Sequence, residues 1–227
     1  MRQARSSTGR AILRSLTFLL VMLVMTVPAA AKKDPTKKQS SKVKLAQNYY
    51  LNNRLAEALS TLDEVLKEDS KYLEARQLRG QVLFGLDAID DALVEFDRVL
   101  ALDKGYTEGR NWRAFALVQL GRYDEAMTEY ERALKDLTYP TPEKIHANKG
   151  MLYRLMKRND EAIASLEESV RLNPSYVKGF YELGVTWAAS GDMEKARKQF
   201  ENVIKMAPNA PEARMARDRL DRMVTPS

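Results

Sequence analysis

The chain has 227 residues, of which 44% are hydrophobic and 30% are charged, and this composition predicts either one ordered domain or a repeat array. It contains no cysteine, so disulfides, thiolate metal sites, cysteine nucleophiles and a lipid-modified cysteine are excluded for this sequence. The formal net charge is +6, but residues 1–31 contribute +4 and residues 32–44 contribute +5, which leaves −3 for the remainder. A mildly acidic body predicts that nucleic acid is not a partner.

The first 31 residues have the pattern of a signal peptide. Four arginines precede the apolar run SLTFLLVMLVMTV at residues 15–27, and Pro28 with three alanines follows it. Signal peptidase accepts small residues of this kind, so we predict a signal peptide over residues 1–31 with cleavage after Ala31. An uncleaved membrane anchor is the alternative, because the apolar stretch is at the short limit for a bilayer span.

The segment that follows is rich in lysine. It carries a local charge of +5 and has no apolar periodicity before Val43. Such a segment buries too little apolar surface to become ordered. We therefore predict a flexible linker over residues 32–41, within a lysine-rich tether that extends to Lys44.

The body of the chain contains a repeat. Alanines recur at intervals of 34, 34, 36 and 34 residues: Ala58, Ala92, Ala126, Ala162 and Ala196. Twelve residues before each alanine stands a small residue: Ala46, Gly80, Ala114, Gly150 and Gly184. Four residues after each alanine stands a large one: Leu62, Phe96, Tyr130, Leu166 and Phe200. This grammar predicts pairs of antiparallel helices that approach closely at the small residues, with turns at Asn53, Gly121 and Gly191.

This pattern resembles the tetratricopeptide repeat, and the segments LGRYDEAMTEYERAL (120–134) and LGVTWAASGDMEKARKQF (183–200) follow the consensus of that family closely. The resemblance implies an all-α, right-handed superhelical solenoid. Its expected parts are five units at residues 39–72, 73–106, 107–142, 143–176 and 177–210, and a capping helix at 211–224. The first two units depart from the pattern, because Ser70 and Lys104 replace the helix-ending proline that Pro174 and Pro208 provide in the last two.

In this repeat type the first helix of each pair lines a concave groove, and the positions eight, eleven and fifteen residues before each anchoring alanine are expected to face solvent there. The three series are Tyr50, Phe84, Val118, Arg154 and Ala188; Gln47, Gln81, Phe115, Met151 and Val185; and Val43, Gln77, Asn111, Ala147 and Tyr181. We predict that a protein segment covers this largely apolar lining without the lining residues packing on one another. The candidate partner-binding residues are Tyr50, Gln81, Phe84, Phe115, Val118, Met151, Arg154 and Tyr181. Packing between repeats is the alternative role for each of them.

The residues that could carry catalysis are few. His146 is the only histidine, and its place on the first helix of the fourth unit favours a packing role over catalysis or metal binding. No phosphate-binding glycine loop follows a strand. We therefore predict no enzyme activity, cofactor, metal or small-molecule substrate. A carboxylate clamp of the chaperone-binding type is disfavoured, because Val43, Gln47 and Trp112 occupy positions where its basic and amide residues would be needed.

The single 36-residue interval contains the segment LTYPTP at residues 137–142, and its prolines predict a joint rather than helix interior from Tyr139 to Pro142. This longer turn, followed by Asn148-x-Gly150, resembles the periplasmic repeat proteins of type IV pilus biogenesis and stability. That family assists multimerisation and outer-membrane placement of the secretin, the ring through which the pilus passes. Its members usually carry a lipid-anchored cysteine after the signal peptide, and this chain has Ala31-Lys32 there.

The sequence thus leads to one main hypothesis and two alternatives. The main one is a non-enzymatic periplasmic scaffold that binds a secretin or another pilus component. A tetratricopeptide adaptor for another bacterial envelope or motility complex is the first alternative, and an enzyme is the second. Association with the outer or inner membrane would be indirect, through a partner, or would come from an uncleaved N-terminal segment.

Overall fold

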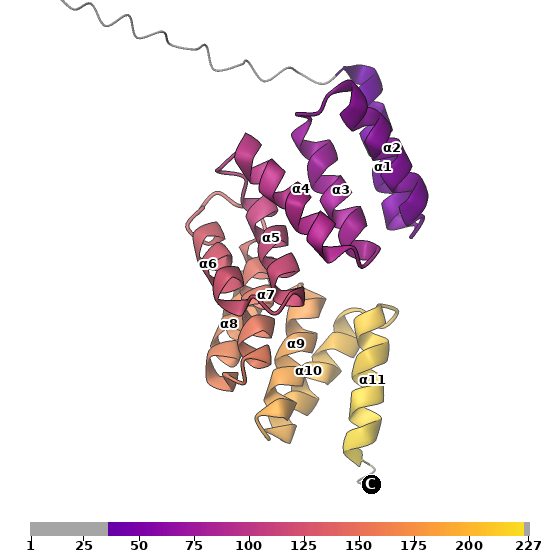
Figure 1. Cartoon of the computed structure of the whole chain (residues 1–227). Coiled ribbons are helices and arrows are strands. Elements are labelled where there is room, and N and C mark those ends of the chain that lie inside the picture. Colours follow the sequence, from indigo (N-terminus) through magenta and orange to yellow (C-terminus); the bar gives the residue numbers. More distant parts are fainter. Residues whose placement is uncertain (1–35, 225–227) are drawn as a thin grey trace, which may run out of the picture. The chain divides into compact units, whose positions relative to one another are not determined.

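The computed structural model describes residues 36–224, and its regular structure over that range is α-helical. The predicted signal peptide and residues 32–35 lie outside the described residues. Within residues 36–224 eleven helices follow one another in chain order, from indigo to yellow in Figure 1. They are α1 (Lys37–Leu51), α2 (Leu55–Glu68), α3 (Leu73–Gly85), α4 (Ile89–Leu102), α5 (Thr107–Gln119), α6 (Tyr123–Ala133), α7 (Pro142–Leu155), α8 (Asn159–Leu172), α9 (Val177–Ala189), α10 (Met193–Met206) and α11 (Pro211–Val224).

The first ten helices form five pairs. Each odd-numbered helix packs on the even-numbered helix that follows it, and each pair packs on the next one. The odd-numbered helices α1, α3, α5, α7 and α9 also contact one another in sequence, whereas no such contact joins the even-numbered helices α2 to α10. The odd-numbered helices therefore make up the inner row of a helical solenoid, and α11 closes its end against α9 and α10. The predicted all-α solenoid of antiparallel helix pairs is confirmed.

The small residues of the repeat lie where two helices of a pair meet. A Cβ atom added to Gly80 would lie 2.5 Å from Phe96 Cε1, and one added to Gly184 would lie 2.8 Å from Phe200 Cε1. No side chain fits at such distances, so the glycine and the large residue sixteen positions later are complementary in shape. The anchoring alanines are all fully buried: Ala58, Ala92, Ala126, Ala162 and Ala196.

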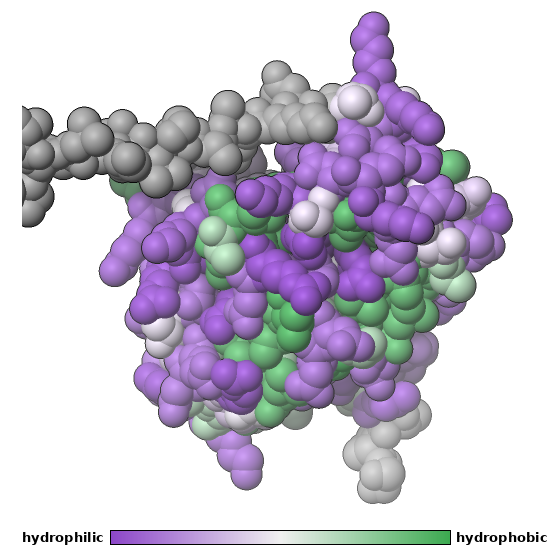
Figure 2. Space-filling model, turned by 45° about the horizontal axis from the view of Figure 1, so that its top comes forward, coloured by the Kyte–Doolittle hydropathy of each residue, from purple (hydrophilic) through white to green (hydrophobic). Residues whose placement is uncertain are grey.

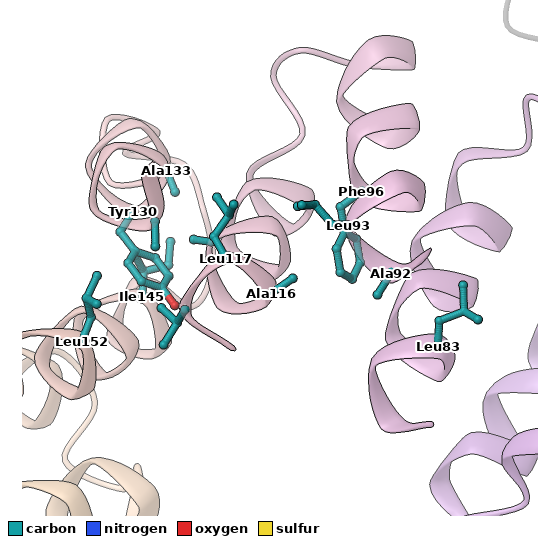
Figure 3. Close-up of a cluster of buried hydrophobic side chains, with 13 residues drawn as sticks. Leu83, Ala92, Leu93, Phe96, Ala116, Leu117, Tyr130, Ala133, Ile145 and Leu152 are labelled. Carbon is teal, nitrogen blue, oxygen red and sulfur yellow. The ribbon is translucent and has the colours of Figure 1, made fainter. Parts of the chain in front are cut away.

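The core runs from one pair to the next. Figure 3 shows Phe96 of α4, Leu117 of α5 and Tyr130 of α6 in one cluster, which continues to Ile145 and Leu152 of α7. These five side chains are fully buried. Because each pair buries its apolar surface against its neighbours, the stability of a unit depends on the units beside it.

Each pair has a tight turn between its two helices, and one residue of every turn has a left-handed backbone conformation. These residues stand five positions before the anchoring alanines: Asn53, Asp87, Gly121, Lys157 and Gly191, with φ between 56° and 89°. Glycine adopts this conformation freely, and asparagine and aspartate tolerate it through local hydrogen bonds. The predicted turn residues Asn53, Gly121 and Gly191 are therefore confirmed.

The N-terminal boundary differs from the prediction. Helix α1 begins at Lys37, because the Thr36 hydroxyl accepts from the Gln39 backbone N–H while the Gln39 side chain accepts from the Thr36 backbone N–H. Lys42 Nζ pairs with Glu64 Oε2 at 2.8 Å, which joins α1 to α2. The prediction of a flexible linker and tether was thus wrong from Lys37 onward. The capping box and the ion pair stabilise the helix although its lysines carry like charges.

A second repeating feature is a buried glutamate surrounded by arginines. Glu95 Oε1 and Oε2 pair with Arg76, Arg79 and Arg98 at 2.8, 3.0 and 2.6 Å respectively. Thirty-four residues later Glu129 pairs with Arg110, Arg113 and Arg132 at 3.0, 3.6 and 2.9 Å. The Glu129 side chain is only 6% exposed, so these partners offset the cost of removing its charge from water.

The close approach at the alanines gives a stability prediction. Replacing Ala126 with leucine should lower the free energy of unfolding by about 1–3 kcal/mol, because the larger side chain overpacks a fully buried site between α5 and α6. Chemical denaturation followed by circular dichroism measures this. Ala164 lies exposed on α8, and its replacement with leucine is the matched control. Equal stability of the two variants would contradict the assigned repeat register.

The buried glutamates give a second prediction. Glu129→Ala should cost about 3 kcal/mol of stability, because the partly buried Arg110 and Arg113, together with the exposed Arg132, lose their common carboxylate. Glu125→Ala, which removes an exposed pair with Arg122, should cost much less. Urea midpoints of the two variants compare the sites. Midpoints that shift equally would show that the buried Glu129 carboxylate contributes no more to stability than the exposed Glu125 carboxylate.

Candidate functional site

The structure places the predicted partner-binding residues in the inner row, but not all of them face solvent. Six are half-buried: Tyr50, Gln81, Phe84, Phe115, Met151 and Arg154. Val118 and Tyr181 are buried, with 8% and 9% of their surface exposed. The expectation that these two residues face solvent was therefore wrong. Tyr181 instead packs on Phe200, with ring centroids 5.8 Å apart.

Most of the residues that stand fifteen positions before an anchoring alanine were also expected to face solvent and do not. Gln77, Asn111 and Ala147 are buried, as Tyr181 is. The reason is their neighbour in the next unit: Asn111 Oδ1 accepts a hydrogen bond from Asn148 Nδ2 at 3.0 Å, between α5 and α7. Positions fifteen residues before the alanine therefore belong mainly to the contact between units.

Three aromatic residues of α3 and α5 form the most distinctive part of the inner row. The rings of Phe84 and Phe115 stack with centroids 4.9 Å apart. Trp112 stands edge-on to both, at 5.9 Å from Phe84 and 6.0 Å from Phe115. We call Phe84, Trp112 and Phe115 the aromatic platform. Because its members pack on one another, the prediction that lining residues do not pack together was wrong here.

The platform is only half-buried, so it retains apolar surface in contact with water. Hydrophobic side chains also reach the surface elsewhere: on the face drawn in Figure 2 they form bands between hydrophilic ones. Half-exposed aromatic side chains contribute strongly to binding when a partner covers them. The platform is therefore the part of the inner row best suited to a protein contact.

Two charged residues from later helices, Arg154 of α7 and Lys178 of α9, lie on the inner row beyond the platform. Lys178 Nζ of α9 lies 6.0 Å from the centre of the Phe115 ring, close enough for a cation–π interaction. Arg154 of α7 donates to Glu182 Oε2 of α9 at 2.7 Å, which compensates its charge. The ammonium of Lys178 is thus positioned to attract a carboxylate of a bound segment, while Arg154 already has one.

Sequence reasoning did not select Trp112, Glu182, Glu108 or Lys178 as site residues. The first two stand fourteen residues before the anchoring alanine, and the last two stand eighteen before it. Extending the helical series of eight, eleven and fifteen by one turn would have reached the eighteenth position. The fourteenth position could not be recognised in this way, since its role depends on the side chain that the preceding unit presents to it.

The joint between α6 and α7 is tied to the start of α5. Thr107 Oγ1 donates to Asp136 Oδ2 at 2.6 Å, and Tyr139 Oη donates to Glu108 Oε2. The hydrogen bond from Thr107 lowers the pKa of Asp136. The pKa of Tyr139 is raised, mainly because the phenol is partly buried and also because it donates to Glu108. Pro142 is the first residue of α7, where its missing N–H costs nothing, so the predicted joint is outside helix interior.

His146 is half-buried on α7. Burial lowers its pKa, and Lys149 and Arg171 lower it further, while Glu168 opposes them. Within residues 36–224 no group of three or more histidine, aspartate or glutamate side chains is arranged to hold a metal ion. The helices over the same range are too short or too polar to cross a membrane.

The depressed pKa of His146 predicts a pH dependence of stability. In the unfolded chain the imidazole has its ordinary pKa of 6.5 and binds a proton at a pH where the folded chain does not. The free energy of unfolding should therefore fall as the pH drops below 6.5, until it passes the folded pKa.

The variant His146→Gln isolates this effect, because it removes the chain's single histidine and leaves every carboxylate in place. Urea midpoints at about pH 7.5 and about pH 5.5 bracket the transition. The wild type should lose more stability between the two pH values than the variant. An equal loss in both proteins would show that His146 does not contribute.

Comparison with known proteins establishes the family. Two tetratricopeptide repeat families match this chain, one at residues 83–138 and the other at residues 43–107 and 148–211. The second alone covers more than half of the chain, so the chain belongs to the tetratricopeptide repeat family. A curated relative, small glutamine-rich tetratricopeptide repeat-containing protein 2 of Saccharomyces cerevisiae, is 33% identical over 80 residues, or 35% of this chain. The matches span 23% or less of the curated relatives' own lengths.

Solved structures share the fold over a larger part of the chain. PilW, described as a widely conserved type IV pilus biogenesis factor, is 24% identical with a TM-score of 0.69, over 85% of this chain and 96% of its own. PilF of Pseudomonas aeruginosa is 20% identical with a TM-score of 0.66, over 83% of this chain and 93% of its own. At these identities the likeness shows a common fold.

Proposed function

We propose that this chain is a non-enzymatic scaffold that holds a segment of a protein partner along the inner row of its helices and assists type IV pilus biogenesis, through assembly or stability of the secretin. The observation that carries the binding role is the aromatic platform. Phe84, Trp112 and Phe115 are brought together from two successive units and remain half-buried. A partner side chain that covers them gains apolar contact over rigid rings.

The flanking groups suggest the chemistry of the partner segment. An apolar side chain would rest on the platform, and a carboxylate nearby would pair with Lys178, which reaches Phe115 from two units further along the chain. Met151 of α7 lies half-buried in the unit between them and adds an adaptable apolar contact. The segment would therefore contact four successive units, from α3 to α9.

The pilus role rests on two kinds of support. The fold likeness to PilW and PilF is one, and the sequence pattern of a signal peptide with the long joint after the third unit is the other. Under this proposal the protein works in the periplasm of a bacterium. Because the chain has no cysteine, its attachment to a membrane would be indirect or would come from an uncleaved N-terminal segment.

A matched pair of double variants tests the binding surface. Met151→Ala with Lys178→Glu should weaken partner capture about tenfold, because it removes an apolar contact and reverses the charge beside the platform. Met193→Ala with Lys198→Glu makes the same chemical changes at exposed positions of α10 and should leave capture unchanged. Both proteins should keep the wild-type helical signal in circular dichroism.

The measurement is co-purification of the secretin from an envelope extract with the tagged full-length protein, quantified for each variant. Secretin capture that is equal in both double variants would contradict binding along the inner row. Capture of no secretin by the wild type would contradict the pilus role. The two claims thus fail separately.

A further inference from the structure

The two-residue insertion of the joint is connected to the aromatic platform through one carboxylate. Tyr139 Oη of the joint donates to Glu108 Oε2, and Trp112 Nε1 of the platform donates to Glu108 Oε1 at 2.8 Å. Glu108 lies one helical turn before Trp112 on α5, so both of its oxygens are held in a fixed place. Tyr139 and Trp112 are each half-buried and pack against the same core cluster.

The two neighbouring units lack this link. The residue equivalent to Glu108 in the preceding unit is Glu74, which is exposed, and the residue equivalent to Trp112 there is Leu78, which has no polar group to donate. In the following unit the equivalent of Trp112 is Asn148, which bonds to Asn111 instead. The link through a carboxylate therefore belongs to the unit that carries the insertion.

The buried amide of Gln77 reflects the same arrangement. Asn111, at the equivalent position one unit later, is satisfied by the residue fourteen before the next alanine. For Gln77 that residue is Trp112, whose single N–H is engaged by Glu108, and both polar side-chain atoms of Gln77 are left without a protein partner. Thus the indole is held toward Glu108 although a buried amide stands on the adjacent helix.

We propose that Tyr139 is a positioning residue: it fixes the Glu108 carboxylate, and through it the orientation of the Trp112 ring against Phe84 and Phe115. The joint thereby sets the shape of the platform without touching a bound partner. Without the Tyr139 hydroxyl, Glu108 is free to rotate toward water and its bond to Trp112 opens more often. That this orientation matters for partner capture rests on the function proposed above.

The direct readout is hydrogen exchange of the Trp112 indole N–H, followed by nuclear magnetic resonance on the full-length protein. The chain has two tryptophans, and the Trp187→Phe variant assigns their signals. Tyr139→Phe removes only the hydroxyl and should speed exchange at Trp112 about fivefold, the factor expected for loss of one typical hydrogen bond, with no change at Trp187. Glu108→Gln should speed it at least as much, because the charge of the acceptor is lost.

Two controls separate this link from general loosening. Thr138→Ala removes the hydroxyl that bonds Asp136 within the same joint, and Glu74→Gln makes the Glu108 change in the preceding unit. Neither should alter exchange at Trp112. Unchanged exchange in Tyr139→Phe would overturn the proposal, as would equally fast exchange in Thr138→Ala. Should Tyr139→Phe fail to fold, Glu108→Gln decides, and unchanged exchange there overturns the proposal as well.

A second arm measures capture of the secretin by Tyr139→Phe, which should fall severalfold, while Thr138→Ala should capture as the wild type does. This arm distinguishes the two proposals. Faster exchange at Trp112 with no secretin captured even by the wild type contradicts the proposed function alone. Normal capture by a Tyr139→Phe protein whose exchange is faster contradicts the role of the joint in binding.

Discussion

The structure depends on one contact that is repeated in every unit, between a small residue on the first helix of a pair and a large residue on the second. At Gly150 an added Cβ would lie 2.6 Å from Leu166 Cγ, so the two helices approach as far as the backbone allows. This approach buries the anchoring alanine and fixes the rotation of the first helix about its axis. Which side chains of that helix reach the inner row then follows from helical geometry.

In the inner row the same repeat positions are therefore in contact from unit to unit, while the residue types at those positions differ. The residue eight positions before one alanine meets the residue fourteen positions before the next: Phe84 meets Trp112 as an aromatic pair, and Arg154 meets Glu182 as an ion pair. The same geometry thus serves an apolar contact in one half of the solenoid and a charged contact in the other. The chemistry of a binding surface changes along the array while the backbone arrangement repeats.

Most of the fold could be predicted from the sequence, because each anchoring alanine marks the place where the two helices of one pair pack closely. The start of α1 was missed because the charge argument favoured a linker, although Thr36 followed three residues later by Gln39 is the sequence pattern of a capping box. The candidate site was predicted only in part. Whether Tyr181 or Phe115 is exposed depends on the helix that packs over it, and Phe200 covers the first while the second remains half-buried.

The central claim, that the inner row binds a protein segment, is tested most directly by site-specific photo-crosslinking in living cells. A photoreactive residue at Gln81, half-buried on α3 beside the platform, is compared with one at Lys198, exposed on α10. The account predicts a crosslinked partner from position 81 and none from position 198. A partner captured from position 198 and absent from position 81 would contradict it.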